Sequence, residues 1–157
     1  MPSDRPAPDR AASFMQRKVF VLRPEMTLDQ AAHALLRHGF SGAPVVDAAG
    51  RVLGVVSELD CLEALAASAF DQAPAGLVAD RMHRTLDTIA PDTDLFAVVQ
   101  RFRENVHRRL LVVDESAHLA GIVARRDVLR ALGHVRRRRD AGVPETTYDE
   151  LRKRWGM

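Results

Sequence analysis

Hydrophobic residues recur along the chain in two sets that follow the same order. Short apolar runs at 19–22 and 86–89 are each followed closely by a proline, which suits a strand and then a turn. In the next stretches, 28–36 and 95–106, apolar residues return every three or four positions, as they do on one face of a helix. The pattern therefore predicts a strand and then an amphipathic helix in each set.

Each set continues with two β-rich runs separated by a few turn-forming residues, which predicts a hairpin. The runs span 43–47 and 52–56 in the first set, and 110–114 and 119–123 in the second. A short segment with leucines at helical spacing then predicts a final helix. One such unit leaves its sheet and helices half covered, so we expect the two units to pack together and bury those faces.

The two sets are copies of one unit. A shift of 67 residues aligns 12–65 with 79–132 without a gap, and 14 of the 54 aligned residues are identical. This duplication predicts an α/β (α+β) fold in which two β-α-β-β-α repeats pack with pseudo-two-fold symmetry. The chain then divides into a flexible N-terminal arm at 1–11, a first repeat at 12–66, a connector at 67–78, a second repeat at 79–133, and a basic tail with a short C-terminal amphipathic helix at 134–157.

Composition and charge limit the kinds of partner and the cellular compartment that we expect for this chain. The formal net charge is +2 and the basic excess lies in the tail, so the body has no charge-based reason to bind nucleic acid. No apolar run approaches the roughly 18 residues of a membrane span, and the first residues lack the pattern of a secretory signal. The single cysteine, Cys61, excludes an internal disulfide and a multi-cysteine metal site. We expect a cytoplasmic protein that requires no cofactor.

One motif stands at the start of the closing helix of the first copy, where Ser57 precedes Asp60 by three residues. This spacing approximates a capping box, in which a hydroxyl and a carboxylate bind free N–H groups of the first helical turn. A helix N-terminus also offers partial positive charge to a phosphate, so a capping role and a binding role are compatible. The second copy has Ala124 in place of Ser57 but keeps Asp127.

Other polar residues have plainer interpretations. Asp47 and Asp114 each end a strand before a turn, and we interpret them as turn formers. The histidines are scattered, and the sequence has no motif of a nucleophilic hydrolase, a metalloenzyme or a phosphate-binding loop. We therefore expect neither a catalytic site nor a metal site.

The tail combines an arginine run, 136–139, with a short helical pattern. Residues 147–150 have the spacing of a capping box, and Tyr148, Leu151 and Trp155 fall at i, i+3 and i+7. So short a helix is marginal alone in water, so we expect it to dock on its own module rather than on a partner chain. Because no aromatic residues interleave the arginines, they are more typical of a solvated face or a contact for an acidic partner than of a nucleic-acid site.

Together these features resemble a tandem pair of CBS domains, often called a Bateman module, over residues 12–132. Residues 14–17 and 80–84 resemble the family's segment before the first strand, and 39–47 resembles its helix-to-strand segment. Residues 54–60 resemble its motif of Gly, two hydrophobic residues, Ser or Thr, and an Asp three positions later. The resemblance implies a non-enzymatic regulatory protein. It also implies a cleft between the repeats with up to two sites for AMP, ADP, ATP or another adenosyl ligand such as NAD or S-adenosylmethionine.

The resemblance further implies that the motif aspartate binds the ribose, that the Ser or Thr faces the phosphate, and that strand backbone holds the base. In this sequence the first site would use Asp60 and Ser57 with Phe20, Val21, Ser41, Gly42, Ala43 and Pro44. The second would use Asp127 with Thr88, Ile89, Leu110 and Leu111. The second copy departs from the family pattern at Ala124, and at Leu111 where the first has Pro44. Arginine binds phosphate well, so Arg108, Arg109 and Arg126 partly offset that loss, unless they only form a solvated face.

The resemblance also implies a homodimer and a separate effector protein that senses a ligand-dependent change in the packing of the repeats. Two other functions stay open at this point, namely a ligand-free interaction or scaffold module and weak nucleic-acid binding through the arginine tail. Nucleotide hydrolysis has no base or metal site to support it. Because the copies differ, we expect the two clefts to differ in affinity or in phosphate preference.

Overall fold

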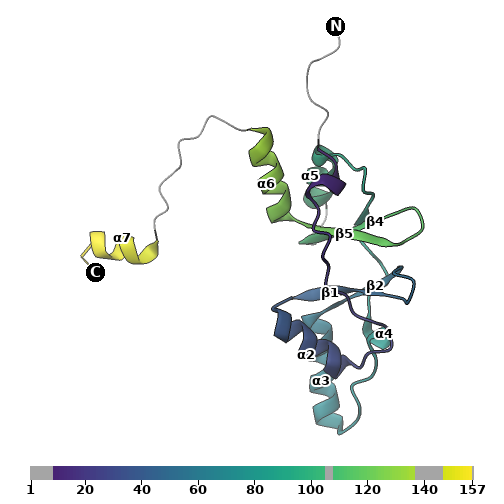
Figure 1. Cartoon of the computed structure of the whole chain (residues 1–157). Helices are drawn as coiled ribbons and strands as arrows, with labels where there is room; N and C mark the ends of the chain where they lie inside the picture. Colours follow the sequence, from purple (N-terminus) through teal and green to yellow (C-terminus); the bar gives the residue numbers. More distant parts are fainter. Residues whose placement is uncertain (1–8, 105–107, 137–146, 157) are drawn as a thin grey trace.

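The structure, a computed structural model, describes residues 9–104, 108–136 and 147–156. Two related halves face each other across their sheets, with helices on the outer sides (Figure 1). The first half contains α2 (Leu28–His38), β1 (Gly42–Val46), β2 (Val52–Ser57) and α3 (Glu58–Asp71). The second contains β3 (Thr88–Ile89), α5 (Leu95–Glu104), β4 (Arg109–Val113), β5 (Leu119–Ala124) and α6 (Arg125–Val135). Three shorter helices are α1 (Ala11–Phe14), α4 (Val78–Arg81) and α7 (Tyr148–Arg154). The predicted α+β fold of two repeats is confirmed.

The hairpins form as predicted, but the first strand of each repeat is shorter than predicted. In the second half this strand is the two-residue β3, which pairs in parallel with β4. In the first half it is reduced to a single bridge between Leu22 and Val45. The physical reason is Pro44. At the equivalent position the N–H of Leu111 donates to the carbonyl of Asp87 at 3.2 Å, and proline has no N–H to donate.

The helices of the first half begin and end at residues suited to caps. Thr27 and Gln30 form a capping box at the start of α2, with backbone-to-side-chain hydrogen bonds of 3.0 and 3.1 Å. The helix ends at Gly39, whose φ of 69° lies in the left-handed region that glycine adopts readily. α3 runs to Asp71 and is longer than predicted, so it takes up the first residues of the expected connector at 67–78.

The stretch before the first strand of each repeat, called the lead-in segment below, begins at α1 in the first repeat and at α4 in the second. Each lead-in segment packs on the other half of the molecule. Ala11 and Met15, from the N-terminal lead-in segment, belong to the buried core of the second half. Val78, from the second lead-in segment, belongs to the core of the first half, and Met82 packs against it. α1 contacts α6 and β5 of the second half, and Figure 1 shows α4 beside the first half. Each core is therefore completed by residues that sequence repetition assigns to the other copy.

Short backbone bridges hold the exchanged segments in place. Gln16 and His83 each exchange two hydrogen bonds, of 2.9 and 3.0 Å, with the second hairpin strand of the opposite half, β5 and β2 respectively. A Cβ at Gly54 would lie 2.8 Å from the carbonyl oxygen of His83, and a Cβ at Gly121 would lie 2.7 Å from that of Gln16. The repeated glycine of the motif is therefore required by this close backbone approach.

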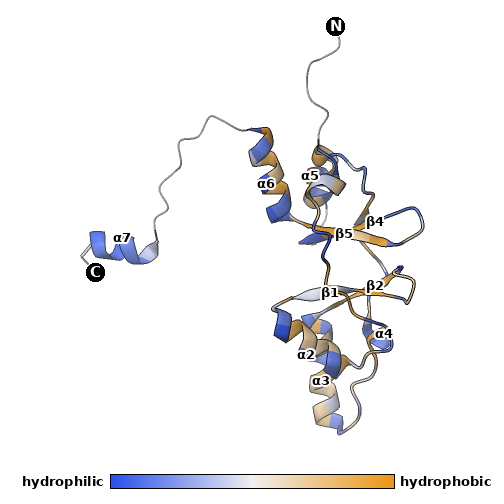
Figure 2. Ribbon diagram, in the orientation of Figure 1, coloured by the Kyte–Doolittle hydropathy of each residue, from blue (hydrophilic) through white to orange (hydrophobic). Residues whose placement is uncertain are grey.

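The C-terminal helix is present but does not dock. Apolar residues concentrate in the strands at the centre of the molecule, whereas α7 is largely hydrophilic (Figure 2). None of the residues of α7 is buried, and Tyr148 and Trp155 are 67% and 61% exposed. The helix itself is confirmed, but the predicted docking on its own module is wrong. Its apolar side chains are few among charged ones, so packing has little area to gain. The arginine run lies outside the described residues, except for Arg136.

Candidate functional site

Two hollows lie between the halves and share part of their walls. The Gln16 cleft, of about 420 Å³, is lined by Gln16, residues 18–20, Phe40 and residues 124–126. The His83 cleft, of about 490 Å³, is lined by His83, residues 85–87, Ser57, Val55, Leu111, Ser41 and Ala43. Five residues line both clefts: Gly42, Pro44, Arg108, Arg109 and Ile122. Each cleft thus combines one lead-in segment with residues from both hairpins.

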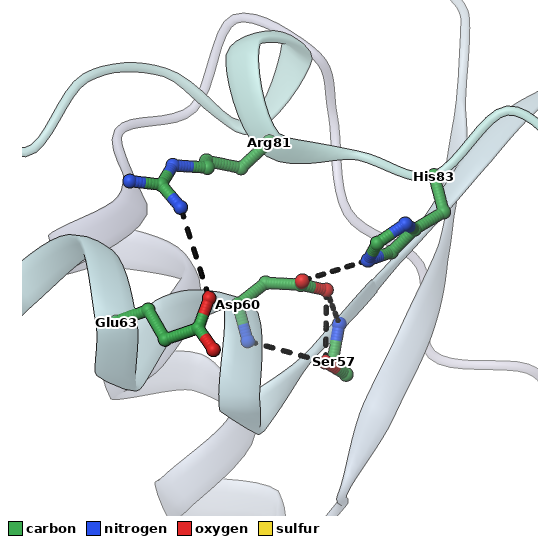
Figure 3. Close-up of polar contacts among 5 residues, drawn as sticks. All are labelled: Ser57, Asp60, Glu63, Arg81 and His83. Carbon is green, nitrogen blue, oxygen red and sulfur yellow. Dashed lines mark hydrogen bonds and ion pairs between the residues drawn. The ribbon is translucent and has the colours of Figure 1, made fainter.

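Asp60 lies behind the wall of the His83 cleft, in the first turn of α3 (Figure 3). Its Oδ2 accepts hydrogen bonds from the N–H of Ser57 at 2.7 Å and from the Ser57 hydroxyl at 2.8 Å. The N–H of Asp60 donates to the same hydroxyl at 3.2 Å, so the predicted capping box is confirmed. The imidazole Nε2 of His83 lies 2.7 Å from Oδ1. The Asp60 side chain is 12% exposed and that of His83 is 66% exposed, so His83 covers the carboxylate from solvent.

A second contact ties the same two elements together. Arg81, at the end of α4, lies 3.9 Å from the carboxylate of Glu63 on α3, as Figure 3 also shows. Both side chains are substantially exposed, so this pair contributes little to the stability of the protein.

Hydrogen bonds keep Asp60 ionised in spite of its burial. Burial is the largest single effect on the pKa of Asp60, and by itself it raises that pKa. The hydrogen bonds from Ser57 and His83 act in the opposite direction and together lower the pKa below its ordinary value of 3.8. The carboxylate is therefore charged at neutral pH. An ionised acceptor of this kind binds the hydroxyl groups of a ligand more strongly than a neutral one does.

Asp127 has the equivalent place behind the Gln16 cleft. Its Oδ2 accepts a hydrogen bond from the N–H of Ala124 at 2.8 Å, and the side-chain amide of Gln16 lies 3.2 and 3.3 Å from its two oxygens. Arg130 is 3.5 Å from Oδ1, and the Asp127 side chain is 2% exposed. The two aspartates are thus alike in position but differ in their partners.

The exchange of lead-in segments reverses the predicted pairing of strands with aspartates. The sequence places Phe20 and Val21 beside Asp60, and Thr88 and Ile89 beside Asp127. In the structure Phe20 lines the Gln16 cleft, together with the motif of the second copy. The lead-in residues that line the cleft in front of Asp60 are instead those of the second copy. Each lead-in segment therefore lines the cleft in front of the aspartate of the other repeat, whereas β3 itself lines neither cleft.

The other predicted site residues fall into different places. Ser41, Ala43, Ser57 and Leu111 line the His83 cleft, and Arg126 lines the Gln16 cleft. The residues that line both are Gly42, Pro44, Arg108 and Arg109. Leu110 is fully buried in the core of the second half. Thr88 and Ile89 line a separate hollow beside α5, and Val21 lines neither cleft.

The cleft residues that sequence reasoning missed come mostly from the lead-in segments. They include Gln16 and Lys18 in one cleft, and His83 and Thr85 in the other. Both segments carry a recognisable sequence pattern, so the sequence indicates that they are important. The sequence does not indicate which cleft each segment lines, because that depends on contacts between residues far apart in the chain.

An aromatic group forms one side of the Gln16 cleft. The ring centroid of Phe20 lies 4.6 Å from that of His38 and 5.8 Å from that of Phe40. The guanidinium of Arg109 lies 6.0 Å from the Phe40 ring, at the outer limit of a cation–π contact. Aromatic faces next to cationic side chains suit a ligand that joins a flat ring to an anionic group.

Asp47 and Asp114 are turn formers, as predicted. Oδ1 of Asp47 accepts backbone hydrogen bonds from Ala49 and Arg51, each of 2.9 Å, and Asp114 makes the equivalent pair in its own turn. The hydrogen bond from Arg51 has the largest effect on the pKa of Asp47 and lowers it. These carboxylates are used by their own turns and line neither cleft.

Within the described residues, no group of three or more His, Cys, Asp or Glu side chains is placed to hold a metal ion. In the same part of the chain, no helix has the length and apolar character of a membrane span. Cys61 is buried, and burial raises the pKa of its thiol, with the nearby charge of Asp60 adding to the effect. A buried thiol of this kind is a core residue.

The solved structures that share this fold include two in complex with nucleotides. CBSX2 from Arabidopsis thaliana, whose structure is a complex with AMP, is 28% identical and superposes with a TM-score of 0.71, covering 82% of this chain and 98% of that one. The cytosolic domain of the Mg²⁺ channel MgtE, in complex with ATP, is 30% identical with a TM-score of 0.67. That match covers 78% of this chain and 48% of the other.

Sequence comparison leads to the same family. An uncharacterized 17.7 kDa protein from the bps2 3' region of Acidianus ambivalens is 29% identical over 123 residues, which are 78% of this chain and 73% of that protein. Three further curated relatives are longer proteins, of which the chain spans 24%, 37% and 20%. The family model for the CBS domain matches residues 11–67 and again 78–134. The chain therefore belongs to the CBS-domain family, as a tandem pair of CBS domains.

Proposed function

We propose that this chain is a regulatory module that binds an adenosine-type nucleotide in the clefts between its two CBS repeats. The observation that carries the proposal is the composition of the two clefts. Each places a buried aspartate at a helix N-terminus behind its wall and exposes arginines and apolar side chains at its surface. The AMP complex of CBSX2 and the ATP complex of the MgtE domain support the same class of ligand.

In this proposal each part of the ligand meets a matching part of the cleft. Ribose hydroxyls donate to the carboxylate of Asp60 and take the position of the His83 imidazole, which lies 2.7 Å from Oδ1. The phosphate binds the guanidinium groups of Arg108 and Arg109, which form charge-assisted hydrogen bonds. The base lies against apolar side chains such as those of Pro44 and Leu111. The chemistry requires no bond to be made or broken.

Regulation follows from where the clefts lie. Residues of both repeats line each cleft, so a bound ligand contacts both halves at once. A ligand changes the balance between two packings of the halves only if it binds one packing more tightly. We propose that a separate effector protein senses this change.

The test is the thermal stability of the full chain with AMP, ADP, ATP, NAD and S-adenosylmethionine at millimolar concentration. A ligand at 100 times its dissociation constant stabilises the folded state by about 2.7 kcal/mol, which gives a measurable rise in melting temperature. Asp60→Ala should reduce the rise for the effective ligand. Asp71→Ala, which removes an exposed carboxylate at the end of α3, is the control and should leave the rise intact. If none of the five compounds raises the melting temperature, the chain is better described as a ligand-free scaffold.

We also propose that the outer helical faces form a homodimer. Leu36, Leu59 and Leu62 of α2 and α3 are 83%, 56% and 65% exposed, and they border an apolar hollow of about 720 Å³. In a dimer with two-fold symmetry, this patch on one copy would pack against the same patch on the other. Both copies would then bury their exposed apolar side chains. Sedimentation analysis should give twice the mass of one chain, and Leu62→Glu should return it to the monomer. A monomeric wild-type protein at micromolar concentration would rule out this interface.

A further inference from the structure

The two clefts differ in charge. Five cationic side chains line the Gln16 cleft, namely Lys18, Arg108, Arg109, Arg125 and Arg126. No acidic side chain of the described residues lines it. Among the described residues, the basic side chains that line the His83 cleft are the shared pair of arginines and His83, and the carboxylate of Asp87 lines it as well. The nucleotide class that each cleft accepts should therefore differ.

The cations of the Gln16 cleft are free to meet a ligand. Lys18, Arg108, Arg125 and Arg126 are exposed, and within the described residues none of their side chains forms a hydrogen bond or an ion pair. They come from three separate parts of the chain, so their charges converge only in the folded molecule. A polyanion placed among them gains several charge-assisted hydrogen bonds without breaking existing ones.

The carboxylates near the clefts strengthen the contrast. Behind the Gln16 cleft, Arg130 lies 3.5 Å from Asp127 and offsets its charge. At the His83 cleft, Arg101 lies 2.5 Å from Asp87 and offsets its charge in the same way, but Asp60 behind the wall has no arginine among its contacts within the described residues. Additional phosphate groups would thus meet more negative charge in the His83 cleft than in the Gln16 cleft.

The shared arginines connect the two clefts. Arg108 and Arg109 line both, and the first copy has Ser41 and Gly42 at the equivalent positions, so it supplies no equivalent pair of arginines. A guanidinium that is bound to the phosphates of one ligand is not available to the phosphates of another. Occupancy of one cleft by a highly charged ligand therefore weakens the other cleft for phosphorylated ligands.

We propose, on the basis of the nucleotide-binding function above, that the Gln16 cleft selects nucleoside triphosphates and that the His83 cleft takes an adenosyl ligand of low charge. The two clefts are coupled negatively through Arg108 and Arg109. The double variant K18A/R125A removes charges from the Gln16 cleft alone, and R108A/R109A removes the shared pair. Arg103→Ala removes an exposed charge from α5, which lines neither cleft, and serves as the matched control.

The experiment is isothermal titration of ATP and of AMP into the full chain and each variant, at two salt concentrations. K18A/R125A should weaken the tighter ATP site by about tenfold or more, which corresponds to about 1.4 kcal/mol, while AMP loses at most about threefold. Saturation with ATP should weaken AMP binding at the remaining cleft of the wild type, and R108A/R109A should abolish this effect. Arg103→Ala should change neither affinity by more than about twofold.

Two results would overturn the inference alone. One is an equal loss of ATP and AMP affinity in K18A/R125A, which would show that Lys18 and Arg125 do not select for phosphate number. The other is AMP binding that is unchanged by saturating ATP in the wild type, which would show that the arginines are not shared. If neither nucleotide binds the wild type, the proposed function fails and this inference fails with it.

Discussion

At the residue scale, Ser57 and Ala124 occupy equivalent positions in front of α3 and α6 and differ by one oxygen atom. Their backbone angles are nearly the same, with φ and ψ of −99° and 164° for Ser57 and −102° and 161° for Ala124. Only Ser57 provides a side-chain cap. The second copy thus keeps the geometry of the capping position and lacks its hydroxyl.

This comparison gives a reciprocal pair of substitutions. Ser57→Ala should destabilise the protein by about 1 kcal/mol, because the N–H of Asp60 loses its acceptor. Ala124→Ser should stabilise it by a similar amount, since the new hydroxyl reaches the N–H of Asp127 in the same way. Urea denaturation of the two variants measures both changes. A destabilising Ala124→Ser would show that the second site has no room for the hydroxyl.

Asp60 makes stability depend on pH at the acid end. Its pKa in the folded protein is below the ordinary value of 3.8, so its ionised form stabilises the folded state above that value. This contribution is lost as the pH falls through the lower, folded pKa. The difference in stability between wild type and Asp60→Asn should therefore shrink between about pH 5 and about pH 2. Denaturant titrations across that range measure it, and a constant difference would contradict the assignment.

At the element scale, the approach of each lead-in segment to the opposite hairpin is controlled by glycine. Gly54→Ala should destabilise the protein by about 1–3 kcal/mol, because the new Cβ would lie 2.8 Å from the backbone oxygen of His83. The control is Gly133→Ala in α6, where nothing lies within 4 Å of the added Cβ. That change should instead stabilise the helix by about 0.5–1 kcal/mol. Thermal and urea unfolding of the two variants should move in opposite directions. Equal effects would mean that the bridge at His83 can shift at no cost.

At the scale of the whole molecule, the two halves are joined by exchanged segments rather than by a surface contact alone. Met15 belongs to the first copy in sequence but packs in the core of the second half, and Met82 packs in the reverse sense. A division of the chain at the connector would therefore strip both cores of native side chains. The two halves should therefore unfold together, as one cooperative unit.

Amide hydrogen exchange can test directly whether each lead-in segment packs in the core of the opposite half. Met15→Ala should cost about 2–3 kcal/mol and lower the protection of the amides of Val112 and Val123, which lie in the second core. Met82→Ala, at a partly buried position, should cost less and act on Val45 and Val56 in the first core. If each variant loosened only its own sequence copy, the exchanged arrangement would be incorrect.

The sequence predicted the two repeats, the hairpins and the capping box at Ser57 because each depends on a local pattern. Hydrophobic periodicity, turn residues and the spacing of a cap are all properties of neighbouring residues. The sequence did not predict the reduced first strand, although the cause is a single residue. Pro44 removes a hydrogen-bond donor, but the sequence does not show which residue would have accepted that hydrogen bond until the two strands are paired.

The sequence by itself determined that this chain is a duplicated CBS pair with an aspartate at the start of each closing helix. Only the tertiary structure decided which lead-in segment each aspartate meets, and hence that His83 faces Asp60 while Gln16 faces Asp127. It also decided that five cations converge on one cleft and that a single pair of arginines serves both. The physical reason is that these contacts join residues far apart in the chain, so they follow from packing of the halves and leave no local pattern.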